Sequence, residues 1–85
     1  LRDAGDTLPV RYLLGRKLQQ LGASAEALPH LEAVLTMAPP PTLERETRRL
    51  AIEAAFALGR CGTVTTLATE PRHRDWVARC AFAFP

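Results

Sequence analysis

Apolar residues in this chain return at the spacing of an α-helix, in segments that glycines and prolines separate. The first apolar stripe consists of Val10, Leu14, Leu18 and Leu21. Its spacing of i, i+4, i+8 and i+11 predicts one face of a helix over residues 8–21, with Thr7 as its N-cap. Gly22 follows the last apolar position and suits the left-handed conformation that ends many helices. The pattern therefore predicts a chain built of short helices.

The same signals predict a second and a third helix. Ser24 is the expected N-cap of the second, and Pro29 lies early enough in it to cause a slight kink without breaking it. Pro39-Pro40-Pro41 ends this helix, Thr42 is expected to cap the third, and Gly59 ends the third. The two predicted core stripes are Ala27, Leu28, Leu31, Val34, Leu35 and Ala38, and then Leu43, Thr47, Leu50, Ala51, Ala54, Ala55 and Leu58.

The last third of the chain carries a weaker helical signal. Residues 60–71 are rich in β-branched side chains, which by propensity favour a strand. Because a lone strand would leave its backbone groups without partners, we predict a short helix over residues 64–69, capped by Thr63 and ended by Pro71. The final apolar stripe consists of Trp76, Cys80 and Phe84. Its spacing of four predicts a fifth helix over residues 73–84, so the expected fold is an all-α, antiparallel helix-turn-helix array.

Composition fits one small helical domain over residues 1–85. Hydrophobic residues make up 47% of the chain and charged residues 24%, and the net charge of +2 is too small for a strong polyanion-binding field. No apolar run approaches the roughly 18 residues of a membrane span, and Leu1-Arg2-Asp3 does not begin a signal peptide. A single lysine, Lys17, and the absence of asparagine are typical of a high-GC bacterial genome. We expect part of a longer bacterial, cytoplasmic protein.

Spacings within the first helical pair match those of a known repeat. The matching positions are Leu14-Gly15, Leu18, Gly22, Ala27, Leu31 and Pro39. This pattern resembles the tetratricopeptide repeat, although Arg11 stands where that repeat opens with an aromatic residue. Gly15 and Ala27 are expected to be small because the two helices approach most closely there, while Leu14, Leu18 and Leu31 fill the space around them.

The resemblance implies a division of the chain into repeats. The first repeat would span residues 8–39, a degenerate second one residues 42–70, and an additional or capping helix residues 73–84. About three repeats are needed to bury a continuous core, so more repeats, another domain or a second chain is expected to cover the exposed ends. Trp76 and Phe84 would then form an interface at the C-terminal end, through which the chain could also form an oligomer.

The resemblance also implies a concave face that binds a peptide or a partner helix. This groove would be lined by Tyr12, Arg16, Gln19, Arg45, Arg49, Glu53 and Phe56. Arginine pairs suit a carboxylate or an acidic motif, and Tyr12 would supply a rigid contact. The lysines and asparagines with which the family grips a C-terminal carboxylate are missing. A solvated helix surface is the alternative interpretation of these residues.

Other candidate sites carry less signal. The most basic stretch, Arg72-His73-Arg74 with Arg60, Arg79 and Trp76 nearby, is interrupted by Glu70 and Asp75, so we expect no nucleic-acid binding. The spacing of Cys61, His73 and Cys80 is not that of zinc ligands. We expect the two cysteines to be idle thiols in a reducing compartment, with a disulfide as the alternative.

Recognition of a protein partner is the function that these observations favour. Ser24 is the only serine, no glycine-rich phosphate loop is present, and the carboxylates are scattered singly, so we expect no catalysis, cofactor or metal. The prediction is a protein–protein interaction or scaffolding module. The alternative is a helical accessory or sensor segment that packs on its own catalytic domain. A DNA-binding domain is disfavoured because Thr63–Thr69 carries no basic residue.

Overall fold

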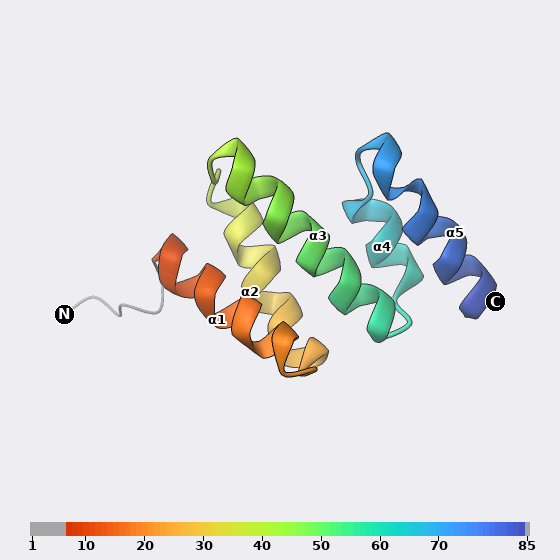
Figure 1. The fold of residues 1–85 in the computed structure, drawn as a ribbon, viewed down its shortest axis with the longest axis horizontal. Coiled ribbons are helices and arrows are strands. Elements are labelled where there is room, and N and C mark those ends of the chain that lie inside the picture. Colours follow the sequence, from red (N-terminus) through yellow and green to blue (C-terminus); the bar gives the residue numbers. More distant parts are fainter. Residues whose placement is uncertain (1–6, 85) are drawn as a thin grey trace.

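A computed structural model describes residues 7–84, which form five α-helices and no strand (Figure 1). The helices are α1 (Leu8–Gln20), α2 (Ser24–Thr36), α3 (Pro41–Ala57), α4 (Cys61–Leu67) and α5 (Arg74–Ala83), and a 3-10 turn, η2 (Pro71–His73), precedes α5. The all-α prediction is confirmed. Residues 1–6, which include Leu1-Arg2-Asp3, lie outside the described residues. None of the helices in this part of the chain has the length and apolar character needed to cross a bilayer.

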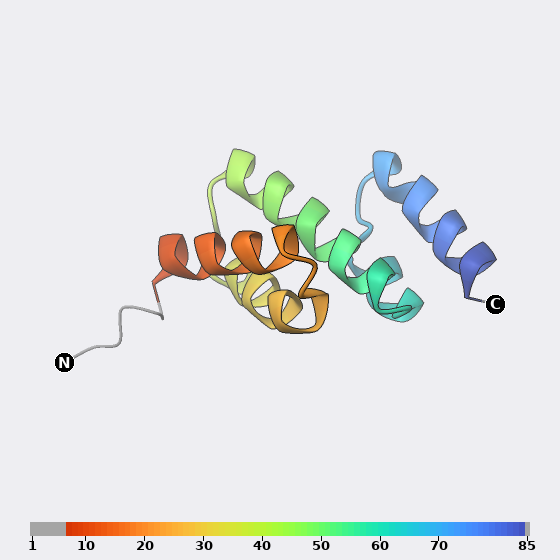
Figure 2. The ribbon, with the colours of Figure 1, turned by 60° about the horizontal axis from the view of Figure 1, so that its bottom comes forward.

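Successive helices reverse direction and form an elongated array with α1 at one end and α5 at the other (Figures 1 and 2). The array measures 46 × 25 × 18 Å. Each helix packs against the next in sequence, and α3 also contacts α1 and α5. Within the described chain, α3 therefore packs against all four other α-helices.

The core lies mainly between α2 and α3. Its buried hydrophobic residues are Ala27, Leu28, Leu31, Val34, Leu50, Ala51, Ile52, Ala54, Ala55, Val64, Leu67 and Cys80. The stripes predicted for the second and third helices are confirmed, with Leu35, Leu43 and Leu58 half-buried at their edges. Ala38 is the exception, since it follows the end of α2 with φ of 50° and is exposed.

The first helix contacts its neighbour through a different face from the one predicted. Gly15 is the only buried residue of α1, whereas Val10, Leu14 and Leu21 are 39%, 42% and 69% exposed. A Cβ on Gly15 would lie 2.9 Å from Cδ2 of Leu31, so the backbone of α1 lies directly against α2 there. The predicted close approach at Gly15 is thus confirmed, and Ala27 is fully buried. The expectation that Leu14 fills the space around this contact is wrong.

Helices α1 and α3 end at the glycines that the sequence predicts. Gly22 and Gly59 have φ of +80° and +70°. The Gly59 N–H donates to the Phe56 carbonyl and the Arg60 N–H to the Ala55 carbonyl, both at 2.9 Å, which is a Schellman motif. Gly22 and the residue after it make the equivalent bonds at the end of α1.

The predicted N-caps of the later helices are wrong. The N-cap positions of α2, α3 and α4 are held by Ala23, Pro40 and Arg60 instead of Ser24, Thr42 and Thr63. Proline is well suited to the first helical position, so α3 begins at Pro41, before Thr42. Thr7 does hold the N-cap position of α1. Pro29 lies inside α2 without breaking it, as predicted.

A disulfide joins Cys61 at the start of α4 to Cys80 in α5, with Cα atoms 5.6 Å apart. The expectation of two idle thiols is wrong, and the reducing compartment inferred from them loses its basis. Cys80 is the only buried residue of α5. A covalent bond therefore holds this helix where apolar burial is slight.

Arg48 links α3 to the end of α4. Its guanidinium donates to the Leu67 carbonyl at 3.1 Å and to the Glu44 carboxylate at 2.7 Å. Leu67 is the last residue of α4, and its carbonyl accepts one further hydrogen bond, from the Thr69 backbone N–H at 2.9 Å. A helix of seven residues is not stable alone, so the Arg48 contact helps to hold α4.

Replacing Gly15 with alanine should destabilise the fold. Overpacking against the fully buried Leu31 costs about 1–3 kcal/mol, while the better helix propensity of alanine returns about 1 kcal/mol. Gly62 is the matched control, because a Cβ there meets nothing within 4 Å. Urea unfolding should show Gly15→Ala less stable than the wild type and Gly62→Ala equally or more stable. Equal gains in both variants would contradict the close approach.

Reducing the disulfide should lower the free energy of unfolding by about 3 kcal/mol, because the bond closes a loop between residues 19 apart. Urea unfolding with and without a thiol reductant measures this difference. The double variant Cys61→Ala, Cys80→Ala should unfold identically in both conditions, which controls for effects of the reductant itself. Coincident curves for the oxidised and reduced wild type would rule out the bond.

Candidate functional site

A cleft of about 420 Å³ opens between the first half of α3 and the segment that begins α5. The residues that line it are Thr42, Arg45, Glu46, Arg49, Arg72, His73 and Trp76. Ligand pockets usually have volumes of about 300–1,000 Å³, so the cleft can hold a few side chains of a bound molecule. One wall belongs to α3 and the other to η2 and the first turn of α5.

His73 is held in the wall by a reciprocal capping arrangement. The Glu70 backbone N–H donates to Nδ1 of His73 at 3.3 Å, and the Glu70 side chain accepts a hydrogen bond from the His73 backbone N–H. Because Nδ1 accepts, this arrangement assigns the ring proton to Nε2. The side chain is nine-tenths buried, so its ring position is fixed. The ring of His73 is thus a fixed part of the cleft lining.

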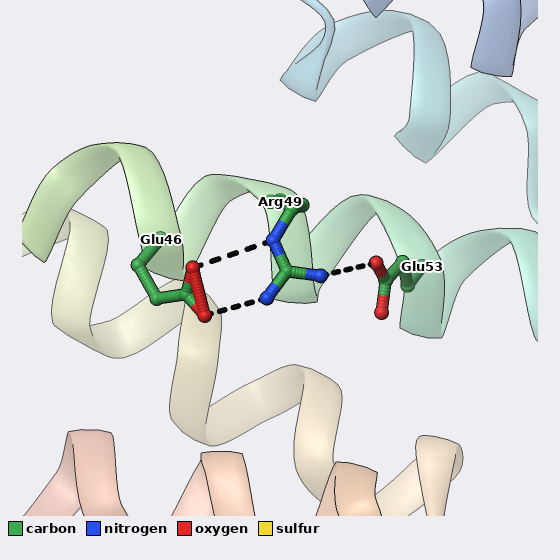
Figure 3. Close-up of polar contacts among 3 residues, drawn as sticks. All are labelled: Glu46, Arg49 and Glu53. Carbon is green, nitrogen blue, oxygen red and sulfur yellow. Dashed lines mark hydrogen bonds and ion pairs between the residues drawn. The ribbon is translucent and has the colours of Figure 1, made fainter.

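Arg49 is held by two carboxylates of its own helix (Figure 3). Its Nη2 lies 2.5 Å from Oε2 of Glu46, and its Nη1 lies 2.5 Å from Oε2 of Glu53. The hydrogen bond with Glu46 is the largest cause of the raised pKa of Arg49; burial opposes it, and the charge of Glu53 adds to it. The positive charge of Arg49 is therefore already matched within α3.

Arg45 is the cleft cation that remains for a ligand. Arg72 pairs with Glu70 at 2.9 Å, whereas exposed Arg45 has no ion pair within the described part of the chain. Arg45 and His73 thus line the same cleft. The N–H groups of a guanidinium suit a carboxylate or another anionic group.

Trp76 supplies the apolar wall of the cleft. Its ring meets Phe56 edge-to-face, with centroids 5.4 Å apart, and the Arg79 guanidinium carbon lies 5.4 Å from the ring centroid. Phe56 makes a second edge contact with Phe84, at 5.8 Å. These contacts fix the indole, because such aromatic pairs stabilise one another beyond simple burial. Trp76 is half-buried, while Phe84, the other residue expected at an exposed end, is 44% exposed.

The structure does not gather the seven predicted groove residues in one place. Arg45 and Arg49 line the cleft, and Glu53 pairs with Arg49. Tyr12 packs half-buried against the core, and Gln19 accepts a hydrogen bond from the Ser24 hydroxyl at 3.1 Å. Arg16 is exposed on α1, at the other end of the array. Phe56 instead lines a second hollow, described next.

The second hollow is apolar and has a volume of about 480 Å³. Phe56, Ala78, Arg79, Phe82 and Ala83 line it, and Phe82 is 90% exposed. Sequence periodicity missed Phe82 because this residue lies off the predicted inner stripe of α5. It also missed His73 as a cleft residue, because Glu70 and His73 do not match the Ser/Thr-x-x-Glu/Gln pattern that signals a capping box in a sequence.

The remaining sequence candidates carry no site of their own. Arg79 pairs with Asp75 at 2.8 Å, so two arginines of the basic stretch, Arg72 and Arg79, are matched by carboxylates. No group of three or more metal-binding side chains occurs in residues 7–84. Comparison with known proteins found no matching family model, no matching curated protein and no matching solved structure. The geometry of the cleft is therefore the main guide to function.

Two neighbouring arginines of α3 should differ in their contribution to stability. Arg48→Ala should cost about 2 kcal/mol, because it removes charged hydrogen bonds at a side chain that is only 18% exposed. Arg49→Ala should cost no more than about 0.5 kcal/mol, because its ion pairs lie at the surface. Thermal and urea unfolding of the two variants measure the difference. Equal losses would show that Arg48 does not anchor α4.

Proposed function

We propose that this chain is a recognition module that binds a peptide segment of a partner protein in the cleft between α3 and α5, with no catalytic step of its own. The observation that carries the proposal is a cleft in which Arg45, which has no ion pair among the described residues, lies with the buried His73 and the indole of Trp76. Burying an acidic side chain against Arg45 and an apolar one against Trp76 would use both kinds of wall.

The arrangement of the helices supports the same proposal. The cleft lies between α3 and the segment that begins α5, two helices that run in the same direction, while α4 returns between them (Figure 1). Peptide-binding helical repeats present their ligand sites on alternate helices in this way. We therefore also propose a tetratricopeptide-like arrangement for the chain, which the close approach of α1 and α2 at Gly15 supports.

The second candidate function is an accessory segment that packs on a catalytic domain of its own protein. The apolar hollow around Phe82 favours this candidate. Phe82 is an aromatic side chain that is 90% exposed, and contact with another protein surface would bury it. This candidate places the contact at the C-terminal end of the array and leaves the cleft unused.

Selection from a library of short random peptides displayed on phage tests the cleft. The full chain should select peptides that contain an acidic residue, and Arg45→Glu should weaken their binding by at least about tenfold, since a charged hydrogen bond contributes about 1.5–3 kcal/mol. Arg74→Glu is the matched control, because Arg74 is an exposed arginine outside the cleft. The affinity of Arg74→Glu for the selected peptides should fall less than the affinity of Arg45→Glu for them.

Two results would contradict peptide binding in the cleft. One is an equal loss of peptide affinity in Arg45→Glu and Arg74→Glu, which would show that binding depends only on the net charge of the chain. The other is selection of peptides whose binding depends on Phe82 and not on Arg45, which would favour the accessory-segment alternative.

A further inference from the structure

Four large aliphatic side chains lie exposed along one helix at the end of the array. Val10, Leu13, Leu14 and Leu21 of α1 and its C-cap are 39%, 57%, 42% and 69% exposed, and we call them the outward stripe. Gly15, which packs on α2, marks the opposite side of the helix. No other described helix lies beyond α1 at this end of the molecule (Figure 1).

The spacing of the outward stripe suits contact with another helix. Val10, Leu14 and Leu21 follow the alternating steps of four and three of a coiled-coil seam, with Lys17 at the position between them. An amphipathic helix binds such a surface through apolar residues at i, i+3, i+4 and i+7. Isolated exposed leucines are ordinary, but a row of them along one helix marks an interaction surface.

Charge decides what kind of helix fits. The sequence of α1 contains three basic residues and no acidic one. Lys17 is exposed within the row of the outward stripe and Arg16 is exposed at its side, and neither makes an ion pair within the described residues. Arg11, the third, is turned toward α2, where its Nη1 lies 3.3 Å from Nδ1 of His30. A partner that covers the stripe must therefore approach two positive charges, one within the stripe and one at its side.

A second copy of this chain does not supply the required charge. If two copies met through α1, the Arg16 and Lys17 charges of one copy would face those of the other, and like charges across an interface are unfavourable. If α1 met the far end of the array, it would face α5, whose one carboxylate, Asp75, is already paired with Arg79, while Arg74 remains.

We infer that the outward stripe of α1 binds an amphipathic helix of another protein that carries aliphatic residues on one face and acidic residues beside them. The inference goes beyond the proposed peptide cleft, because the surface lies at the opposite end of the array and takes a helix in place of an extended segment. Its two parts are separable: the stripe supplies affinity, and Arg16 with Lys17 supplies the preference for acid.

A displayed library of helices about three heptads long tests both parts. Aliphatic residues are fixed at the seam positions, and the flanking positions vary between glutamate, glutamine and lysine. The full chain should enrich helices with glutamate flanks. The double variant Arg16→Glu, Lys17→Glu should reverse the preference and enrich helices with lysine flanks.

Substitution of the stripe tests the surface itself. Leu14→Glu should reduce binding of the enriched helices by at least about tenfold. Phe82→Glu is the matched control, because it places the same charge on an exposed apolar residue at the other end, and it should leave binding unchanged. Arg45→Glu should also leave it unchanged, which separates this surface from the cleft. Leu13→Glu is the second variant if circular dichroism shows that Leu14→Glu does not fold.

Three results would overturn the inference. The first is enrichment of no helix above an uncoated surface, and the second is enrichment of the same acidic helices by the charge-reversed variant. The third is a dimer in sedimentation experiments that Leu14→Glu converts to monomer, which would assign the stripe to a second copy of the chain.

Discussion

The fold depends on the packing of α3 against all of its neighbours. Six residues of this helix are buried, and three of them are alanines, Ala51, Ala54 and Ala55. Small side chains let neighbouring helices approach a central helix closely from several directions. The dispersion contacts between the closely packed helices then stabilise the core. The core stripe of α2, the short helix α4 and one wall of the cleft are all positioned by this one element. Changes in its alanines would therefore reach the site as well as the core.

The C-terminal half uses specific bonds where apolar burial is limited. The Cys61–Cys80 disulfide joins α4 to α5, and Arg48 joins α3 to the final carbonyl of α4. Edge contacts of Phe56 with Trp76 and Phe84 add a third connection. These bonds fix the second wall of the cleft relative to the first, since Trp76 and His73 belong to the segment that they hold. Structure and candidate function thus rest on the same contacts.

Much of the candidate site was beyond the reach of sequence patterning. Periodicity identified Arg45 and Arg49 as one exposed face of a helix, and the i, i+4 spacing predicts the Arg49–Glu53 pair, which is confirmed. It could not show that Glu46 also pairs with Arg49 while Arg45 has no ion pair among the described residues. That distinction depends on side-chain distances. His73 lines the site because η2 turns the chain toward α3. Sequence patterning does not show which segments lie next to each other in space, so it could not place His73 beside α3.

Local chemistry in the sequence determined where helices form and end. Helical spacing of apolar residues, two turn glycines and the proline run predicted five helices, and the stripes of α2 and α3 became the core. Tertiary structure decided which face of α1 is buried, because close approach at Gly15 brings a backbone against Leu31 and turns the larger leucines outward. Hydrophobic periodicity counts apolar side chains, and glycine has none. It therefore predicts that the face with the most leucines is buried, and it misses the face that carries Gly15. It also could not pair Cys61 with Cys80, since that pairing depends on the distance between two helices.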